Sequence, residues 1–235
     1  MYNTLINNKY IVSFIAGCIN TLSFAPFFLF PFVIISFMII IFLLDNIKSI
    51  REIIIIGWLY GFGNFVTGLY WIIYALLTDS DEFLILSPLS NIILPGFLAI
   101  YPCVTLLVSH IMNKHFSNYY RYIILAVNWT SIEYARSILF SGFPWNLTGY
   151  TVCFSESLSQ IISIIGIYGC SCLIIIISSA IYNLFYKRYI YSMIILAVTS
   201  SIYLYGNQRL NNIIEYEDVN LLLVQGNISQ HDMLT

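Results

Sequence analysis

The sequence predicts an all-α polytopic membrane protein: a bundle of about seven transmembrane helices, followed by the opening of a second, α/β domain. Three observations support this prediction. Of the 235 residues, 60% are hydrophobic and only 9% are charged, whereas a typical soluble domain is about 25% charged. Apolar runs of near-spanning length follow one another from residue 10 to residue 205. After Gly206 this pattern stops and a short strand-like segment follows.

The transmembrane candidates are separated by polar residues, glycine and proline. A helix that crosses the bilayer needs roughly 20 predominantly apolar residues. Seven candidates result: Tyr10–Ala25, Leu29–Leu44, Ile53–Leu77, Leu89–Met112, Tyr122–Phe140, Leu158–Phe185 and Tyr189–Tyr205. Residues 10–44 could form one broken span or two short ones. We expect a tight helical hairpin, because no small-residue cleavage site marks a signal peptide and the apolar run continues past Pro31.

Lysine and arginine predict the orientation, because cytoplasmic loops of membrane proteins are enriched in them. With a cytoplasmic N-terminus, seven of these residues fall on the cytoplasmic side: Lys9, Lys48, Arg51, Lys114, Arg121, Lys187 and Arg188. Arg209 alone lies clearly on the other side, and Arg136 lies within a span. Seven spans then place the chain after Gly206 outside the cytoplasm.

The segment Asp218–Asn227 is typical of the first buried strand and turn of an α/β domain. A lone strand cannot satisfy its backbone N–H and C=O groups, and the sequence offers no second strand to pair with it. We therefore divide the chain into a transmembrane domain, residues 1–206, and a linker with the first strand of an incomplete domain, residues 207–235.

Several kinds of site are disfavoured by the sequence. A net charge of -2 gives no nucleic-acid signal. Cys170 and Cys172 diverge on a helix with no histidine nearby, so we expect no metal site, and nothing predicts a cofactor. No nucleophile and base have a recognisable spacing. Gly57, Gly61 and Gly68 fall within a span, where they allow another helix to approach closely.

Glu133 and Arg136 are the most informative polar residues of the fifth span. They are three residues apart, so both project from similar faces of the helix. An unpaired carboxylate is costly inside a membrane. Two interpretations remain open: an internal ion pair that fixes helix packing, or a polar anchor for a lipid headgroup near the outer surface.

The segment Phe140–Tyr150 follows directly. Pro144 stops a helix, Gly142 and Gly149 allow tight turns, and Trp145 and Tyr150 suit the membrane–water boundary. The loop could be an interfacial anchor or could shape an entrance for lipid. The candidate lipid-binding or structural motif comprises Glu133, Arg136, Phe143, Pro144, Trp145 and Tyr150.

Five segments in this order resemble one family, the apolipoprotein N-acyltransferases of bacterial inner membranes. They are Thr21–Pro26, Gly61–Trp71, Glu133–Arg136 with Gly142–Trp145 and Gly149–Tyr150, Ile165–Ser171, and Val219–Gln230. The Gly-Phe-Pro-Trp and Val-Gln-Gly-Asn segments are the most specific. Ser137 departs from the family pattern, which usually has glycine after the arginine.

The resemblance implies a phospholipid-dependent acyl transfer. An acyl chain would pass from a membrane phospholipid to an enzyme thiol, and then to the N-terminal cysteine amine of a diacylated apolipoprotein. It also implies a multi-pass protein of the bacterial inner membrane, with a cytoplasmic N-terminus and a periplasmic nitrilase-like domain after the seventh span.

No catalytic residue can be assigned in this sequence, because the family's Glu, Lys and Cys belong to the nitrilase-like domain, beyond Thr235. We therefore expect a truncated chain that is inactive alone, unless a separately encoded nitrilase-like half completes it. A small membrane transporter and a non-catalytic scaffold are the alternatives. Transporters tend to contain internal repeats, and the sequence contains no convincing one.

Overall fold

A computed structural model describes residues 2–77, 87–116, 120–140, 142–212 and 222–225. These residues form helices and connecting turns, with no strand among them. The helices are α1 (Tyr2–Asn7), α2 (Lys9–Asn20), η1 (Thr21–Ser23), α3 (Pro31–Asn46), α4 (Ile50–Gly68), α5 (Ile72–Leu77), α6 (Ser87–Leu98), α7 (Ile100–His115), α8 (Arg121–Ile138), η3 (Thr148–Phe154), α9 (Glu156–Ser159), α10 (Ile162–Leu184) and α11 (Tyr189–Leu210).

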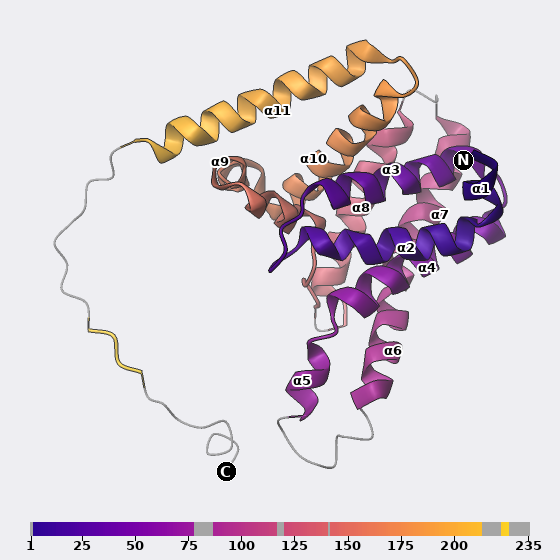
Figure 1. The fold of residues 1–235 in the computed structure, drawn as a ribbon, viewed down its shortest axis with the longest axis horizontal. Helices are drawn as coiled ribbons and strands as arrows, with labels where there is room; N and C mark the ends of the chain where they lie inside the picture. Colours follow the sequence, from indigo (N-terminus) through magenta and orange to yellow (C-terminus); the bar gives the residue numbers. More distant parts are fainter. Residues whose placement is uncertain (1, 78–86, 117–119, 141, 213–221, 226–235) are drawn as a thin grey trace.

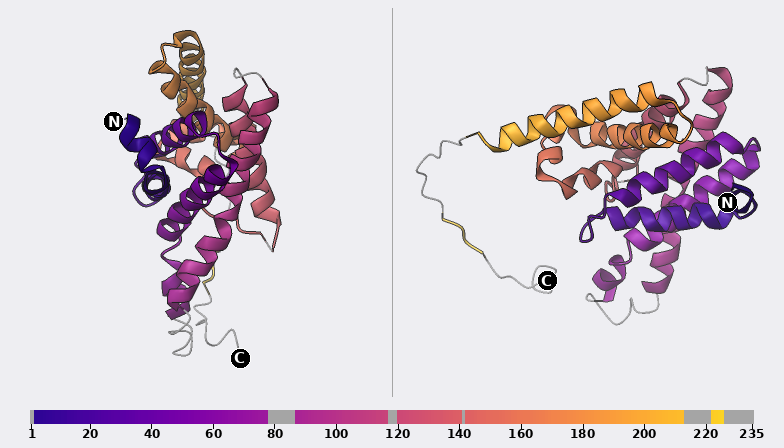
Figure 2. Two further views of the ribbon diagram at one scale, coloured as in Figure 1. Left: turned by 90° about the vertical axis from the view of Figure 1, so that its right-hand side faces the viewer. Right: turned by 45° about the horizontal axis from the view of Figure 1, so that its top comes forward.

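Residues 10–44 form a helical hairpin rather than one broken helix. Figure 1 shows α2 and α3 side by side, joined by a turn at one end. Pro31 is the first residue of α3, where its missing N–H removes no helical hydrogen bond. The hairpin packs on α4 and α10, and it lies toward one side of the bundle in both views of Figure 2.

Three helical segments of the described chain are long and apolar enough to cross a membrane: Asn91–His115, Ile162–Leu184 and Tyr189–Leu210. They coincide with the fourth, sixth and seventh expected spans. α3 is apolar but shorter, so the total of seven stays a prediction. The expected continuous span Ile53–Leu77 is divided, because α4 ends at Gly68 and α5 begins at Ile72.

Glycines of α4 allow the close helix contacts that the sequence predicts. A side-chain carbon at Gly57 would meet the backbone of Cys103 in α7, and one at Gly61 would meet the backbone of Ala99, just before that helix. Gly68 differs from the prediction, because it faces the side chain of Asn146 in a loop instead of another helix. Gly57 and Gly61 therefore serve one close contact with α7, and Gly68 serves a contact with a loop.

The core is aromatic where α3, α4 and α8 meet. Trp129 of α8 contacts Phe37 edge to face at 4.9 Å between ring centroids, and Tyr60 at 5.8 Å. All three rings are buried. Edge-to-face contacts of this kind add to the stabilisation from burial alone, so Trp129 holds α8 in a fixed position against both neighbours.

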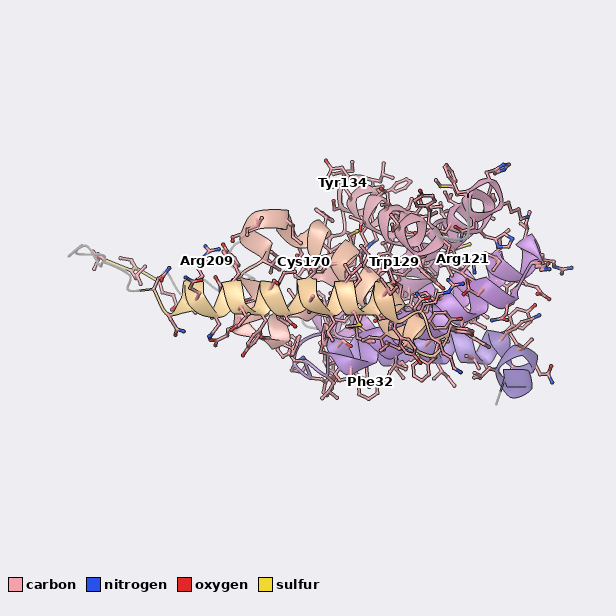
Figure 3. The ribbon with its side chains drawn as sticks, turned by 90° about the horizontal axis from the view of Figure 1, so that it is seen from above. Phe32, Arg121, Trp129, Tyr134, Cys170 and Arg209 are labelled. Carbon is pink, nitrogen blue, oxygen red and sulfur yellow. The ribbon has the colours of Figure 1, made fainter. Side chains whose placement is uncertain are left out.

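Two ion pairs join helix ends on one side of the bundle. Lys9 at the start of α2 lies 2.6 Å from Glu52 near the start of α4, and Arg121 at the start of α8 lies 2.6 Å from Asp45 near the end of α3. Arg209, near the end of α11, lies at the opposite end of the molecule from Arg121 (Figure 3). Lys9 and Arg121, two of the seven basic residues predicted to be cytoplasmic, therefore lie at ends of the helices that ion pairs join, away from Arg209.

The expected strand Asp218–Asn227 falls mostly outside the described residues. Leu222, Leu223, Val224 and Gln225 are described, and they form no regular secondary structure. The three apolar side chains among them are more than 80% exposed. α11 continues to Leu210, five residues beyond the expected end of the seventh span.

Candidate functional site

Glu133 joins α8 to the segment that follows it. Its side chain is 6% exposed, and its Oε1 atom accepts three hydrogen bonds. The donors are the indole N–H of Trp129 at 3.0 Å, and the backbone N–H and the hydroxyl of Thr148, both at 2.8 Å. A carboxylate with three donors on one oxygen fixes the start of η3 against the helix.

Arg136 holds the same segment at a second point. Its Nη1 atom donates to the carbonyl oxygens of Phe143 at 3.0 Å and Trp145 at 2.7 Å. The guanidinium lies over the ring of Phe65 in α4, 5.1 Å from its centroid. With only 2% of the residue exposed, Arg136 lies behind the loop and faces its backbone.

Of the two interpretations that the sequence leaves open for Glu133 and Arg136, the direct ion pair does not form between these two described residues. No nitrogen–oxygen distance of 4.0 Å or less joins them, whereas such pairs do join Lys9 to Glu52 and Arg121 to Asp45 within the described chain. The two charges share a helix face, as their spacing predicts, but each bonds a different part of the loop. Their partners in the loop are two backbone carbonyls and Thr148, which carry no charge and have no signature in the sequence.

In front of this loop lies a pocket of about 620 Å³. Three segments that are far apart in the chain form its wall: the turn between α2 and α3, the end of α4 with the residues after it, and the loop after α8. The lining residues are Thr21, Phe24, Ala25, Pro26, Phe27, Phe28, Thr67, Gly68, Tyr70, Trp71, Pro144, Trp145, Asn146, Tyr150 and Cys153. Most of these side chains are apolar or aromatic, so the pocket suits a hydrophobic ligand.

The loop conformation brings two tryptophans together at this pocket. Trp145 and Trp71 lie 5.1 Å apart between ring centroids, at an angle of 58°. Between Trp145 and the next helix, Asn146 has a φ of 52°, a left-handed conformation that asparagine tolerates better than most residues. Its side chain fits against Gly68, where a larger residue would collide with it.

The six predicted site residues separate into three groups. Pro144, Trp145 and Tyr150 line the pocket. Glu133 and Arg136 lie behind it and hold the loop. Phe143 is not among the lining residues and packs against the cluster that contains Phe65 and Leu98. Gly142 has the left-handed backbone, φ 80°, that its predicted turn requires, whereas Gly149 instead packs against the backbone of Ile167 in α10.

Sequence reasoning missed most of the opposite wall. The expected spans Tyr10–Ala25 and Ile53–Leu77 contain Phe24 and Trp71, and Phe27 and Phe28 fall in the connection between the first two spans, yet all four residues line the pocket. These aromatic residues do not stand out in an apolar sequence, because nothing in their polarity distinguishes a pocket wall from a membrane span. Their only indication in the sequence was their place in or beside the segments Thr21–Pro26 and Gly61–Trp71, which carry the family resemblance.

The pocket can bind an apolar chain, but its walls offer little for covalent chemistry. Cys153 supplies a thiol, and partial burial raises the pKa of this thiol, which disfavours the nucleophilic thiolate. No histidine, glutamate, aspartate or lysine is among the lining residues. Across the described residues, no group of three or more His, Cys, Asp or Glu side chains gathers to hold a metal.

Fold and site together define a helical membrane protein with an apolar pocket at one end of its helices. The sequence model for the apolipoprotein N-acyltransferase N-terminal domain matches residues 16–180. The chain therefore belongs to the apolipoprotein N-acyltransferase family, whose members are acyltransferases of lipoprotein biosynthesis.

Curated relatives agree with this assignment. The chain is similar to the apolipoprotein N-acyltransferase of Rickettsia bellii, with 34% identity over 91% of this chain and 43% of the relative. The Rickettsia prowazekii protein is 32% identical over 98% of this chain and 46% of its own length. The Rhodopseudomonas palustris protein is 36% identical over 71% of this chain and 32% of its own length. The chain thus spans less than half the length of these relatives.

Proposed function

We propose that residues 1–235 form the lipid-binding membrane part of an apolipoprotein N-acyltransferase, and that the 620 Å³ pocket receives an acyl chain of the phospholipid donor. The observation that supports this most is the composition of the wall. Its three segments coincide with or border three of the segments that resemble the family, and they present Phe27, Trp71 and Trp145 to one space.

The position of the pocket along the helices is consistent with this role. It lies where α2 and α4 end, and the ion-paired ends of α2, α4 and α8 lie at the other side of the bundle. With the basic end in the cytoplasm, a seven-span arrangement puts the pocket at the periplasmic boundary of the inner membrane. A diacylated apolipoprotein would approach from that side.

Acyl transfer itself needs a nucleophile, a base and a charge stabiliser within hydrogen-bond reach. Because the pocket walls lack this set, we assign the chemistry to a nitrilase-like domain, in the same polypeptide or in a separately encoded half. An assay of residues 1–235 with phospholipid and a diacylated lipopeptide is then expected to give no N-acylated product. Product formation would refute this division of roles.

Lipid occupancy is testable by photocrosslinking. Residues 1–235 are reconstituted in nanodiscs with a phospholipid that carries a diazirine near the end of one acyl chain. Peptides that contain residues 21–28, 67–71 and 144–153 should be labelled more strongly than the exposed apolar face of α11, which reports bulk lipid. Unlabelled phospholipid should reduce the labelling of the pocket peptides at a lower concentration than it needs to reduce the labelling of α11.

Two tryptophan variants provide a matched comparison. Trp145 is 52% exposed and lines the pocket, whereas Trp58 is 37% exposed and donates to the carbonyl of Gly96 outside it. Burying a large apolar side chain is worth about 1.5–3 kcal/mol, so loss of a half-buried one should weaken capture about three- to tenfold. Trp145→Ala should reduce pocket labelling and Trp58→Ala should not. Equal labelling in both variants would contradict the proposal.

A further inference from the structure

A second, much smaller cavity lies behind the loop, among α2, α4, α7 and α8. Its volume is about 20 Å³. The residues that line it include Asn20, Trp129, Glu133, Arg136 and Asn146. A water molecule needs roughly 10–15 Å³ of such space, so this cavity has room for one.

Two oxygen atoms of its lining residues lack a hydrogen bond. The Oε2 atom of Glu133 and the Oδ1 atom of Asn20 are buried and have no partner among the described residues. The two residues are 6% and 2% exposed. Their other polar atoms are used: Glu133 Oε1 binds Trp129 and Thr148, and Asn20 Nδ2 donates to Asn64 at 2.9 Å.

The chemistry of these atoms selects the ligand. Both are acceptors, and a buried acceptor without a donor is unfavourable, more so if it is charged. A ligand must therefore donate two hydrogen bonds and be no larger than one heavy atom with its hydrogens, because the cavity holds only about 20 Å³. Arg136 also lines the cavity, and its positive charge disfavours a bound metal cation.

We propose that this cavity is a binding site for one water molecule, which donates to Glu133 Oε2 and Asn20 Oδ1. The water connects α2 to the residues that hold the loop, and its oxygen can accept a hydrogen bond from Arg136 or Asn146. Buried waters of native proteins typically make about three hydrogen bonds. This inference does not rest on the proposed lipid function.

X-ray hydroxyl-radical footprinting tests the site, because radicals form from water and oxidise side chains next to it. Trp129 lines the cavity and is 6% exposed, whereas Tyr60 is 0% exposed and lies outside it. In residues 1–235 reconstituted in nanodiscs, Trp129 should be oxidised at least severalfold faster than Tyr60. Equal rates near the background level would mean a dry cavity and would overturn the proposal.

Two variants assign the labelling to the site. Asn20→Leu removes one acceptor and fills the space, so oxidation of Trp129 should fall to the level of Tyr60. Asn183→Leu is the control, since Asn183 is 1% exposed with an unpartnered Oδ1 but lies in α10, outside the cavity. This control should leave Trp129 oxidation unchanged, and an equal fall in both variants would contradict the assignment.

A proton on Glu133 is the competing explanation, because a carboxylic acid could donate to a neighbouring acceptor itself. Infrared spectra distinguish the two cases. A protonated-carboxyl band that Glu133→Gln abolishes would overturn the proposed donation from water to Glu133 Oε2, whatever the rate of Trp129 oxidation. Absence of that band with rapid Trp129 oxidation is the expected result.

Discussion

Replacement of Arg136 by alanine should destabilise the membrane domain through its loop. The change removes the hydrogen bonds to Phe143 and Trp145 and the contact with the Phe65 ring, and it leaves two carbonyls without their donor. On the soluble-protein scale, two charge-assisted bonds are worth about 3–6 kcal/mol. Couplings measured inside membranes average about 0.6 kcal/mol each. We expect a loss of about 2–4 kcal/mol in unfolding free energy, because Arg136 is almost fully buried.

The assay is unfolding of the purified chain in mixed detergent micelles, followed by tryptophan fluorescence. Lys48→Ala is the control, because Lys48 is an exposed residue between α3 and α4; such surface changes alter stability by about 0.5 kcal/mol or less. Arg136→Lys should be intermediate, since one ammonium group reproduces the forked geometry only in part. Equal stability of the Arg136→Ala and Lys48→Ala variants would refute the role of Arg136 in holding the loop.

Two further predictions concern glycine and Glu133. Gly57→Ala should lower stability by about 1–3 kcal/mol, because its side chain would meet the backbone of Cys103. Gly96→Ala should instead raise stability by about 0.5–1 kcal/mol through helix propensity, because the nearest atom to the added carbon is a Trp58 ring carbon at 3.7 Å. The same unfolding assay measures both variants. Effects of the same sign would be inconsistent with the α4–α7 contact. Glu133→Ala should disturb the near-ultraviolet circular dichroism of Trp129 more than Glu133→Gln does, because glutamine keeps an oxygen for Thr148 and Trp129. Equal changes in the two variants would mean that the charge, and not the acceptor oxygen, holds Thr148, because both substitutions remove the charge and only glutamine keeps an oxygen.

Sequence patterns predicted the helices well where their signal is a long apolar run. The last two spans extend close to their predicted limits, and the glycines of α4 contact α7 as expected. The break after Gly68 was missed, because Leu69, Tyr70 and Trp71 are apolar and continue the hydrophobic run. In the structure Tyr70 and Trp71 line the large pocket, and Trp71 contacts Trp145.

For the site, the sequence predicted the loop after α8 but not the hydrogen bonds that hold this loop against the helix. Charged residues at membrane depth are rare, so Glu133 and Arg136 were conspicuous. Their partners could not be predicted, because backbone carbonyls and N–H groups occur at every position of a chain. An ion pair between the two charges was one of the two interpretations that the sequence left open, and in the structure both residues form hydrogen bonds to the loop instead.

The wall of the large pocket has a consequence for protein engineering. It is assembled from the α2–α3 turn, the end of α4 and the loop after α8, and each segment takes its position from a different helix. Transplanting residues 143–150 into another helical bundle would carry over one side of the wall and neither of the other two. Conversely, shuffling whole hairpins between related chains would change the pocket even if every lining residue were identical, because the spacing between α2, α4 and α8 sets its width. The transferable unit is thus the whole bundle. A library of variants aimed at new ligands should vary the residues at the contacts between helices together with the lining side chains.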